Sequence, residues 1–508
     1  MRIYGDETVK EKQMKYFRIH TADNAYLTKQ PRGIFTTVGK LVDAKTMNEE
    51  EIKEYWKNRE YFERVLPVPP FYENGNPEGA ITWFKDSEEG KQIYAQMSFY
   101  REMASKYGVE LFRSETEEIP GEIIYEDEFQ IAVKNVRSDI KVTTKKESFV
   151  WPDYKNCIAN LPNSILKYFG VETVGDTLPL ADKYLDKDYK NVVVLLLDGM
   201  GKAIIERHLK EDGAFRSNLA GIYKSTFLST TVCATTSVLS GLKPCEHAWI
   251  GWEIYYPSVD QNVVVFHNWK QGTEEQAAPY NIPWTLTPYE NVIEKIKKSG
   301  TDAYFVAQFM DNSINDFNDI CLSVKKLCEK PEKKYIYAYW NQPDGIMHKT
   351  GCGTDETHET IVELENAVSK LAGELEDTLI LVTADHGHMD NEIAVLQDYP
   401  ELIDCLERLP SLEPRVLNFF VKKEKEEFFK KEFNRIFGDK FMLITKEEAL
   451  RRELFGDGKY HKEFLGMLGN YIAIATDDTS IYFTDERWAA MHGSLTEDEM
   501  YIPLIVFK

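Results

Sequence analysis

Apolar runs of strand length alternate with amphipathic segments of helical length along the second part of the chain. Four runs are long and apolar enough for buried strands: 191–197, 303–309, 335–340 and 378–383. Between and after them, residues 202–209 and 359–375 space their apolar positions as helices do. Buried strands that alternate with helices are typical of an α/β fold, in which helices cover both faces of a largely parallel central sheet.

The first part of the chain has a different pattern. Residues 1–138 combine many aromatic side chains with turn signals such as Pro31-Arg32-Gly33. Residues 80–84 and 129–133 have strand character, and 48–64 has helical spacing. This pattern predicts a separate small α+β domain with a structural or recognition role, and we find no catalytic signature in it.

The change in pattern also sets the domain boundaries that we expect. A chain of 508 residues exceeds what one hydrophobic core usually holds. Residues 139–147 (DIKVTTKKE) are polar and predict a linker to a second domain over 148–508. Within that domain, residues from about 395 to 480 are more charged and interrupt the last sheet elements, which predicts an inserted cap.

Charge narrows the classes of partner. The formal net charge of −23 disfavours binding to a nucleic-acid polymer, because the phosphate backbone would be repelled. A small phosphate substrate would be repelled as well, so a phosphate enzyme of this composition needs a local positive charge, for which bound metal is the obvious source. The apolar runs are too short to cross a membrane.

Two features bear on the cellular compartment. Residues 1–13 are charged and lack the apolar stretch of a secretory signal, so we expect no export by that route. The seven cysteines are scattered, odd in number and form no CxxC pair. They predict free thiols in a reducing cytoplasm rather than a disulfide framework.

Carboxylates follow three of the predicted strands. Asp198 precedes Gly199, Asp344 precedes Gly345, and Asp385 precedes His386. One aspartate at a strand end is usually a cap or turn residue. Three in one domain, two of them with nearby histidines, indicate a metal site, because ligands collect where the strands of such sheets end.

Further candidates lie around these acids. Asp344 and His348 are four residues apart, so one helical turn presents both to the same ion. His492 precedes a glycine and the final apolar run, and this setting makes it a stronger candidate for a metal ligand than an isolated histidine. His388, two residues beyond His386, is a candidate for orienting a ligand from behind.

The hydroxyl-rich segment 225–247 (STFLSTTVCATTSVLSGLKPCEH) holds the candidate nucleophile. Thr230 and Thr231 both precede a stretch of small residues with helical character. A threonine at a helix N-terminus faces partial positive charge, which helps to hold an anion. Metal coordination would be the route from its hydroxyl to a reactive alkoxide.

Five pieces of sequence, in order, resemble the alkaline phosphatase superfamily, in particular its type I phosphodiesterase/nucleotide pyrophosphatase family. They are LLLDGMG, STT…SGLKPCEH, PDGIMHKTG, TADHG and HGSLTEDEMYIPLI, and they span about residues 190–508. The resemblance implies an alkaline-phosphatase-like core that holds two divalent metal ions, expected to be zinc. One would be held by Asp344, His348 and His492, and the other by Asp198, Asp385, His386 and the Thr231 oxygen.

The resemblance also implies a reaction. Counted back from Gly241, which matches the glycine of the family motif, the nucleophile is Thr231. Its attack on a small-molecule phosphate ester would give a phospho-threonine intermediate, which water then hydrolyses. A phosphodiesterase or nucleotide pyrophosphatase activity is therefore expected.

This chain departs from the family in one place that concerns the substrate. Cys233 and Ala234 stand where nucleotide pyrophosphatases carry a proline and a phosphate-contacting asparagine. The missing contact puts a nucleotide substrate in doubt. Thr235 is a candidate replacement for that contact. Trp249 and Trp252 are candidates for stacking on a base or sugar, although packing is the commoner role of such residues.

Several alternatives remain at the level of sequence. The same ligands would serve a phosphomonoesterase or a phosphonate hydrolase, and a catalytically silent binding protein could keep the fold. A sulfatase is disfavoured, because Cys233 is followed by Ala-Thr-Thr with no arginine. The sequence names neither the physiological substrate nor the oligomeric state.

Overall fold

A computed structural model describes residues 15–25, 28–72, 75–147, 149–484 and 488–508. Residues 1–13, on which the expectation about export depends, lie outside this part. The chain forms two compact units. The first unit comprises Met1–Phe149 with Lys431–Asp439, and the second comprises Val150–Lys430 with Lys440–Lys508.

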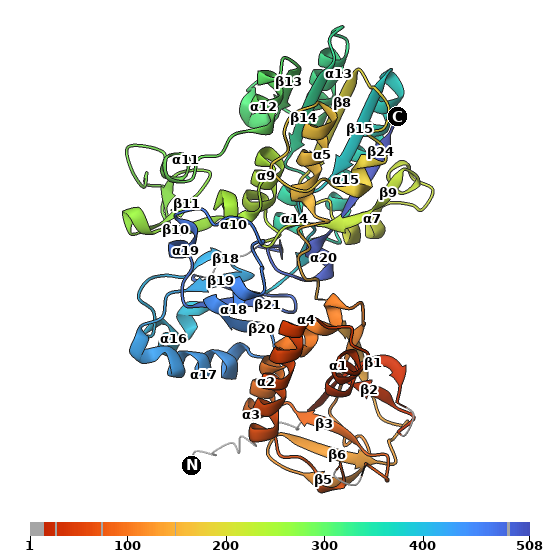
Figure 1. Cartoon of the computed structure of the whole chain (residues 1–508), viewed down its shortest axis with the longest axis vertical. Helices are drawn as coiled ribbons and strands as arrows, with labels where there is room; N and C mark the ends of the chain where they lie inside the picture. The colour runs from red at the N-terminus through yellow and green to blue at the C-terminus, as the bar shows by residue number, and fades with distance from the viewer. Residues whose placement is uncertain (1–14, 26–27, 73–74, 148, 485–487) are drawn as a thin grey trace, which may run out of the picture. The chain divides into compact units, whose positions relative to one another are not determined.

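The first unit is built on an antiparallel sheet in the order β5-β6-β3-β1-β4-β7, with β2 paired to β1 (Figure 1). The strands are β1 (Tyr16–Asn24), β2 (Pro31–Gly33), β3 (Ile81–Lys85), β4 (Leu111–Thr116), β5 (Glu122–Glu126), β6 (Gln130–Lys134) and β7 (Thr143–Glu147). The helices are α1 (Ile34–Asp43), α2 (Glu49–Val65), α3 (Glu88–Gln96) and α4 (Ser98–Lys106). One core cluster joins residues of the strands and the helices, including Phe17, Val38 and Tyr100.

Local sequence explains how α2 begins. Asn48 accepts a hydrogen bond from the Glu51 backbone, and the Glu51 side chain accepts one from the Asn48 backbone (2.9 and 2.8 Å). This capping box satisfies two backbone donors that a helix start would otherwise leave unpaired. The predicted helix over 48–64 therefore forms almost as expected.

Part of the predicted linker is a strand instead. Residues 143–147 form β7, which pairs antiparallel with β4 along five residues. The stretch looks like a linker because its side chains are mostly exposed. As an edge strand, β7 needs hydrogen bonds from one neighbour rather than an apolar face, so hydropathy does not reveal it.

The second unit contains a central sheet in the order β13-β14-β8-β15-β24-β9. The strands are β13 (Asp302–Val306), β14 (Lys334–Trp340), β8 (Asn191–Leu197), β15 (Thr378–Thr383), β24 (Tyr501–Phe507) and β9 (Leu219–Lys224). The first four run parallel, while β24 pairs antiparallel with β15 and β9. Every residue of β8 and β15 is buried, as expected for strands covered on both faces.

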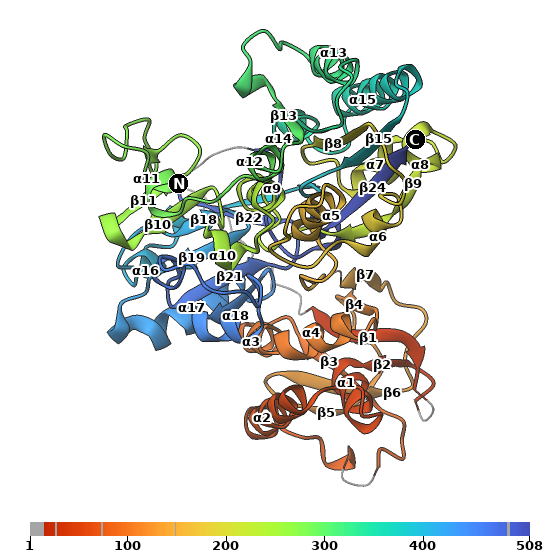
Figure 2. The ribbon, with the colours of Figure 1, turned by 45° about the horizontal axis from the view of Figure 1, so that its top comes forward.

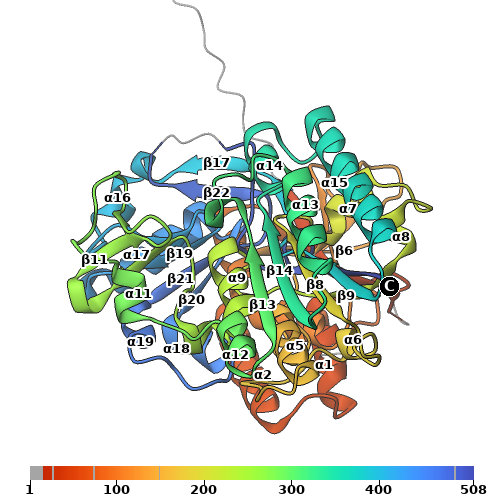
Figure 3. The ribbon, with the colours of Figure 1, turned by 90° about the horizontal axis from the view of Figure 1, so that it is seen from above.

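Helices cover both faces of this sheet (Figure 3). On one face lie α7 (Lys202–His208), α13 (Phe317–Cys328) and α15 (Asp355–Glu374). On the other lie α5 (Leu161–Tyr168), α9 (Thr231–Ser240) and α12 (Val292–Lys298). The mixed α/β class predicted from the sequence is confirmed.

A second sheet of the same unit is antiparallel, in the order β12-β11-β10-β18-β19-β21-β20 (Figure 2). The region expected as a cap, about 395–480, supplies β18 (Ser411–Glu413), β19 (Val416–Phe419), β20 (Phe441–Thr445) and β21 (Tyr471–Ala475). The other strands come from an earlier segment: β10 (Glu253–Tyr256), β11 (Gln261–Val264) and β12 (Trp269–Lys270). The sequence prediction left this segment out, because strands of two to four residues give no clear periodicity.

Two short pairings complete the second unit. β16 (Met389–Asp390) pairs with β23 (Ala490–Met491), and β17 (Glu392–Val395) pairs with β22 (Thr479–Tyr482). The first pairing brings the chain just after His388 beside the chain just before His492. Among the described helices, none is long and apolar enough to cross a membrane.

Candidate metal centre

The carboxyl ends of β8, β14 and β15 meet at one edge of the central sheet. In the parallel register, Leu197 lies opposite Trp340, and Thr383 lies opposite Leu196. Asp198 follows β8 directly, Asp385 follows β15 after one residue, and Asp344 begins α14 (Asp344–Thr350) shortly after β14. The expected convergence of the three strand-end aspartates is therefore present.

Glycines allow the loops at this edge to approach closely. Gly199 has φ +73°, and a Cβ there would lie 3.0 Å from the Asp344 Cβ. A Cβ on Gly201 would lie 2.3 Å from the Gly387 Cα. Any larger residue at these positions would push the loop after β8 away from Asp344 or from the turn after β15.

One group of ligand-type atoms consists of Asp198, Asp385 and His386, all fully buried or nearly so. Nε2 of His386 lies 3.3 Å from Oδ1 of Asp198 and 3.5 Å from Oδ2 of Asp385. Tyr339 donates its hydroxyl proton to Oδ2 of Asp198, which fixes that carboxylate. Burial and the neighbouring Asp198 charge raise the pKa of Asp385 well above its ordinary value.

Thr231 reaches this first group. It is the first residue of α9, and its Oγ1 lies 3.2 Å from Nε2 of His386 and 3.5 Å from both carboxylate oxygens of Asp198. Thr230, the other candidate, points elsewhere: it donates to Oε1 of Glu413 at 2.7 Å and is 1% exposed. Of the two threonines, only Thr231 presents its hydroxyl to the group.

A second group consists of Asp344, His348, His388 and His492. Oδ1 of Asp344 lies 3.3 Å from Nε2 of His348, 3.1 Å from Nε2 of His388 and 3.5 Å from Nε2 of His492. The imidazoles of His386 and His492 stack at 3.7 Å between centroids and 16° between planes. The two groups are therefore immediate neighbours.

Hydrogen bonds orient the imidazoles. Nδ1 lies against a backbone carbonyl in three histidines: His348 (Ala490 O, 2.8 Å), His386 (Gly387 O, 2.9 Å) and His492 (Ser229 O, 3.1 Å). Because a carbonyl oxygen only accepts, Nδ1 carries a proton in each of these rings, and in the neutral ring Nε2 then holds the lone pair. Each of these Nε2 atoms lies 3.3–3.5 Å from carboxylate oxygens. In the neutral ring, the Nε2 lone pair and the carboxylate oxygen are therefore two hydrogen-bond acceptors facing each other.

This arrangement suits bound cations. A lone pair directed at a carboxylate is repulsive unless a positive ion or a second ring proton lies between them, and within the described residues Oδ2 of Asp385 is buried without a hydrogen-bond partner. Imidazole and carboxylate donors suit zinc and similar divalent ions. Nδ1 bonded to a carbonyl is also how metal-binding histidines are usually held.

The remaining candidates lie in different settings. Thr235 is one turn further along α9 and donates to the Thr231 carbonyl at 2.6 Å. Trp249 is 2% exposed, donates to the Thr287 carbonyl at 2.7 Å and packs against Trp284. Trp252 is 37% exposed.

Two residues matter more than the sequence indicated. His388 belongs to the second group by distance, whereas the sequence suggested only a supporting role. The sequence signal for this role is the position of His388 two residues beyond His386. Glu413 is buried and accepts from both Thr230 and the Trp252 backbone (2.7 and 2.8 Å). Nothing in the sequence pointed to it, because it lies 183 residues from Thr230.

A mixed α/β sheet with two adjoining carboxylate–histidine groups at its strand ends, and a helix-initiating threonine beside them, defines a candidate two-metal centre of the hydrolase type. The type I phosphodiesterase/nucleotide pyrophosphatase family matches residues 192–495, which is more than half of the chain and includes every residue of both groups. The chain belongs to this family. The resemblance expected from the sequence is confirmed, and family membership supports phosphoester hydrolysis with metal dependence.

Solved structures give more remote likenesses. Murine ectonucleotide pyrophosphatase/phosphodiesterase 5, an inactive variant in complex with AMP, is 14% identical and covers 63% of this chain and 87% of its own, with a TM-score of 0.46. The human protein of the same name is 13% identical, with coverages of 62% and 87% and a TM-score of 0.47. Phosphonoacetate hydrolase from Sinorhizobium meliloti, in complex with phosphonoformate, is 15% identical, with coverages of 62% and 89% and a TM-score of 0.46. No curated protein shows significant similarity to the chain.

Proposed function

We propose that this chain hydrolyses phosphate diesters through a phospho-threonine on Thr231, with two zinc ions as cofactors. The observation that carries the proposal is the position of the Thr231 hydroxyl, 3.2 Å from Nε2 of His386 and 3.5 Å from the Asp198 carboxylate. A hydroxyl placed against a metal-type group is the arrangement that nucleophilic activation requires.

The donor atoms divide between two ions. Asp198, Asp385, His386 and Thr231 would hold one, and Asp344, His348 and His492 the other, with His388 beside the second set. When bound, such ions lower the pKa of a coordinated hydroxyl and neutralise charge on phosphate oxygens. That local positive charge offsets the repulsion of an anionic substrate by a chain whose formal charge is −23.

The chain's own residues support both chemical steps. Deprotonated Oγ1 of Thr231 attacks phosphorus, an Oγ1–P bond forms, and the P–O bond to the leaving alcohol breaks while that oxygen takes up a proton. Water then attacks the phospho-threonine, the Oγ1–P bond breaks, and Thr231 recovers its proton. The N-terminus of α9 directs backbone N–H groups and partial positive charge toward the phosphate during both steps.

The substrate is better described as a small diester than as a nucleotide. The side chains at 233 and 234, where the family has its phosphate contact, are Cys and Ala and are fully buried. Trp249 is engaged in packing, so Trp252 is the better candidate for stacking of the two. A small diester that relies on the metals and the helix N-terminus fits these observations.

We also propose a cytoplasmic location. All seven cysteines lie within the described residues as thiols rather than disulfides, and six of them are buried. Free thiols persist where the compartment is reducing.

Metal content and substrate comparison test the function. The purified chain should contain about two zinc ions and hydrolyse bis-p-nitrophenyl phosphate faster than p-nitrophenyl phosphate or phosphonoacetate. Chelation should abolish hydrolysis, and zinc should restore it. If the monoester or the phosphonate were hydrolysed faster than the diester, the faster compound would identify the substrate class instead. Chelator-resistant turnover would contradict the metal-dependent reaction, and a chain without metal or turnover would be a binding protein on this fold.

A further inference from the structure

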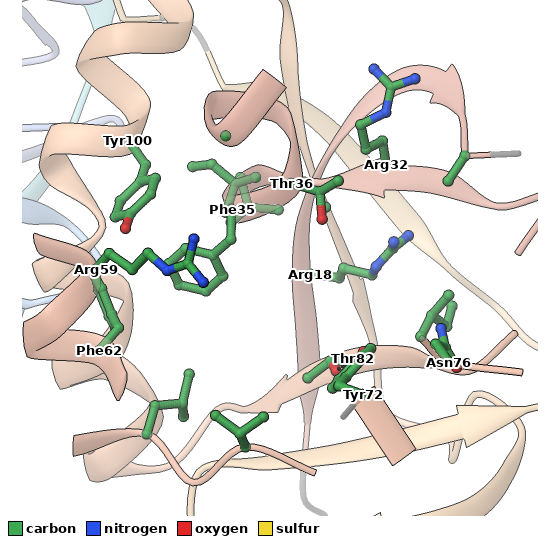
Figure 4. A pocket seen from close by; sticks show the side chains of 18 of the residues that line it. Arg18, Arg32, Phe35, Thr36, Arg59, Phe62, Tyr72, Asn76, Thr82 and Tyr100 are labelled. Carbon is green, nitrogen blue, oxygen red and sulfur yellow. Dashed lines mark hydrogen bonds between the residues drawn. The ribbon is translucent and has the colours of Figure 1, made fainter. Parts of the chain in front are cut away.

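The first unit contains a pocket of about 680 Å³ between the sheet and helices α1 and α2 (Figure 4). Its wall on the helical side is aromatic, with Phe35, Phe62 and Tyr100 among the lining residues. A volume of this size, apolar on one side with a few polar groups, is typical of sites for small organic ligands.

A buried cation lines the other side of the pocket. Arg18, on β1, is 7% exposed. Within the described part of the chain, its guanidinium makes one hydrogen bond, to the Pro31 carbonyl (2.5 Å), and no ion pair. Burial lowers the pKa of Arg18 to about 10, so the group remains charged at neutral pH. A buried charge is costly unless it is paired, and the five N–H donors of arginine suit a carboxylate or phosphate.

The surroundings of Arg18 also favour an anion. The lining contains four basic residues, Arg18, Arg32, Lys40 and Arg59, against the acids Asp43 and Glu63, in a chain whose formal charge is −23. Of these acids, Glu63 is already paired with Arg59 at 2.8 Å. Helix α1 begins beside Arg18 without an acidic residue in its first turn, which adds partial positive charge. Figure 4 shows the side chains of Thr36 and Thr82 on either side of Arg18.

We propose that this pocket binds a small organic anion, with a ring-sized apolar body against the aromatic wall and one oxyanion group, carboxylate or phosphate monoester, paired with Arg18. The first unit would then be a ligand-binding module with a site of its own. The donors of Arg18 that do not bind Pro31 supply the polar contact. Thr36 and Thr82 also line the pocket, and the Thr82 hydroxyl is paired with the Tyr72 hydroxyl at 2.9 Å.

Three probes with the same body test the chemistry: 2-naphthoate, 1-naphthyl phosphate and the uncharged 2-naphthamide. Binding is measured by isothermal titration calorimetry on the full chain after chelation, so that the candidate metal centre neither binds nor hydrolyses the probes. At least one anion should bind tenfold or more tightly than the amide, and the tighter anion identifies the oxyanion class. Equal binding of amide and anions, or no binding of any probe at millimolar concentration, would overturn the proposal.

A substitution at Gly33 tests the pairing with Arg18. A Cβ at this position would lie 4.0 Å from Nη2 of Arg18, with no closer neighbour, and the backbone (φ −67°, ψ 155°) suits any residue. Gly33→Asp would place a carboxylate beside the guanidinium and should weaken anion binding at least tenfold. Gly33→Asn has the same size without the charge and should stay within about threefold of the unsubstituted chain.

Both variants are expected to fold, because Gly33 is the N-cap of α1 and Asp and Asn are favourable there. Arg137→Gln, at an exposed ion pair with Asp139 away from the pocket, should leave binding unchanged. Unchanged anion binding in Gly33→Asp, or an equal loss in Gly33→Asn, would show that Arg18 is not the partner. Since these measurements use the chelated chain, they are independent of whether Thr231 catalyses hydrolysis.

Discussion

Nε2 of His388 lies 3.1 Å from Oδ1 of Asp344, closer to that oxygen than the Nε2 atoms of His348 and His492. His388 also differs in its other nitrogen, which lies 3.9 Å from the Cys352 thiol rather than against a backbone carbonyl. His388 therefore holds Asp344 in the second group, whereas the sequence alone predicted only that His388 would orient another ligand.

We expect His388→Asn to weaken zinc binding at the second group about 10- to 100-fold, because Asp344 loses its shortest side-chain contact. Competition with a chromophoric chelator measures this affinity. His358→Asn, a change at an outlying histidine, is the control. Zinc affinity equal to that of the unsubstituted chain would assign His388 to packing alone.

Thr231→Ala should reduce diester turnover at least 10³-fold while about two zinc ions remain bound. The other candidate ligands stay in place, so metal content separates loss of the nucleophile from loss of the centre. Steady-state kinetics and metal analysis on the same sample measure both.

Thr230→Val is the matched variant, since it removes the neighbouring hydroxyl that donates to Glu413. Its turnover should fall less than that of Thr231→Ala. If the valine variant were the inactive one, the nucleophile would be Thr230.

Arg415→Met should destabilise the second unit by about 3–5 kcal/mol. Arg415 and Glu499 are both fully buried and form a bidentate pair at 2.6 and 3.0 Å. The substitution leaves the Glu499 charge without compensation. Urea unfolding measures the loss of stability.

A second substitution separates the charge from the packing. Adding Glu499→Gln to Arg415→Met removes the stranded charge while keeping an acceptor for the Ser494 backbone N–H, so most of the stability should return. Equal stability of the single and double variants would show that the buried charge is not the cause.

The stability difference between Glu413→Gln and the unsubstituted chain should depend on pH. Burial raises the pKa of Glu413 from 4.5 to about 7. Between these values the unfolded chain has released the proton and the folded chain retains it, so the contribution of Glu413 to stability is full below about 4.5 and is lost as pH rises through about 7. Glutamine accepts the same two hydrogen bonds and carries no charge.

The glutamine variant should therefore match the unsubstituted chain near pH 4.5 and exceed it by about 1–3 kcal/mol at pH 8. Urea unfolding of both proteins at the two pH values measures this. A difference that is constant across the range would show that Glu413 titrates normally.

The sequence by itself determined the elements that carry a strong local signal. β8 and β15 form at 191–197 and 378–383 because strands buried on both faces must be apolar throughout. α2 starts where its capping residues place it. The strand-end aspartates also followed from the sequence, because parallel strands bring their carboxyl ends to one edge.

Only the tertiary structure decided which side chains meet. The Thr230 hydroxyl bonds to Glu413 and so points away from the group that Thr231 reaches, and the pairing of β16 with β23 brings His388 beside His492. Residues 253–270 enter the second sheet through β10, and β7 becomes an edge strand. These contacts join segments remote in sequence through short strands, loops and single hydrogen bonds. Hydrophobic periodicity records whether a residue is buried but not which partner it meets.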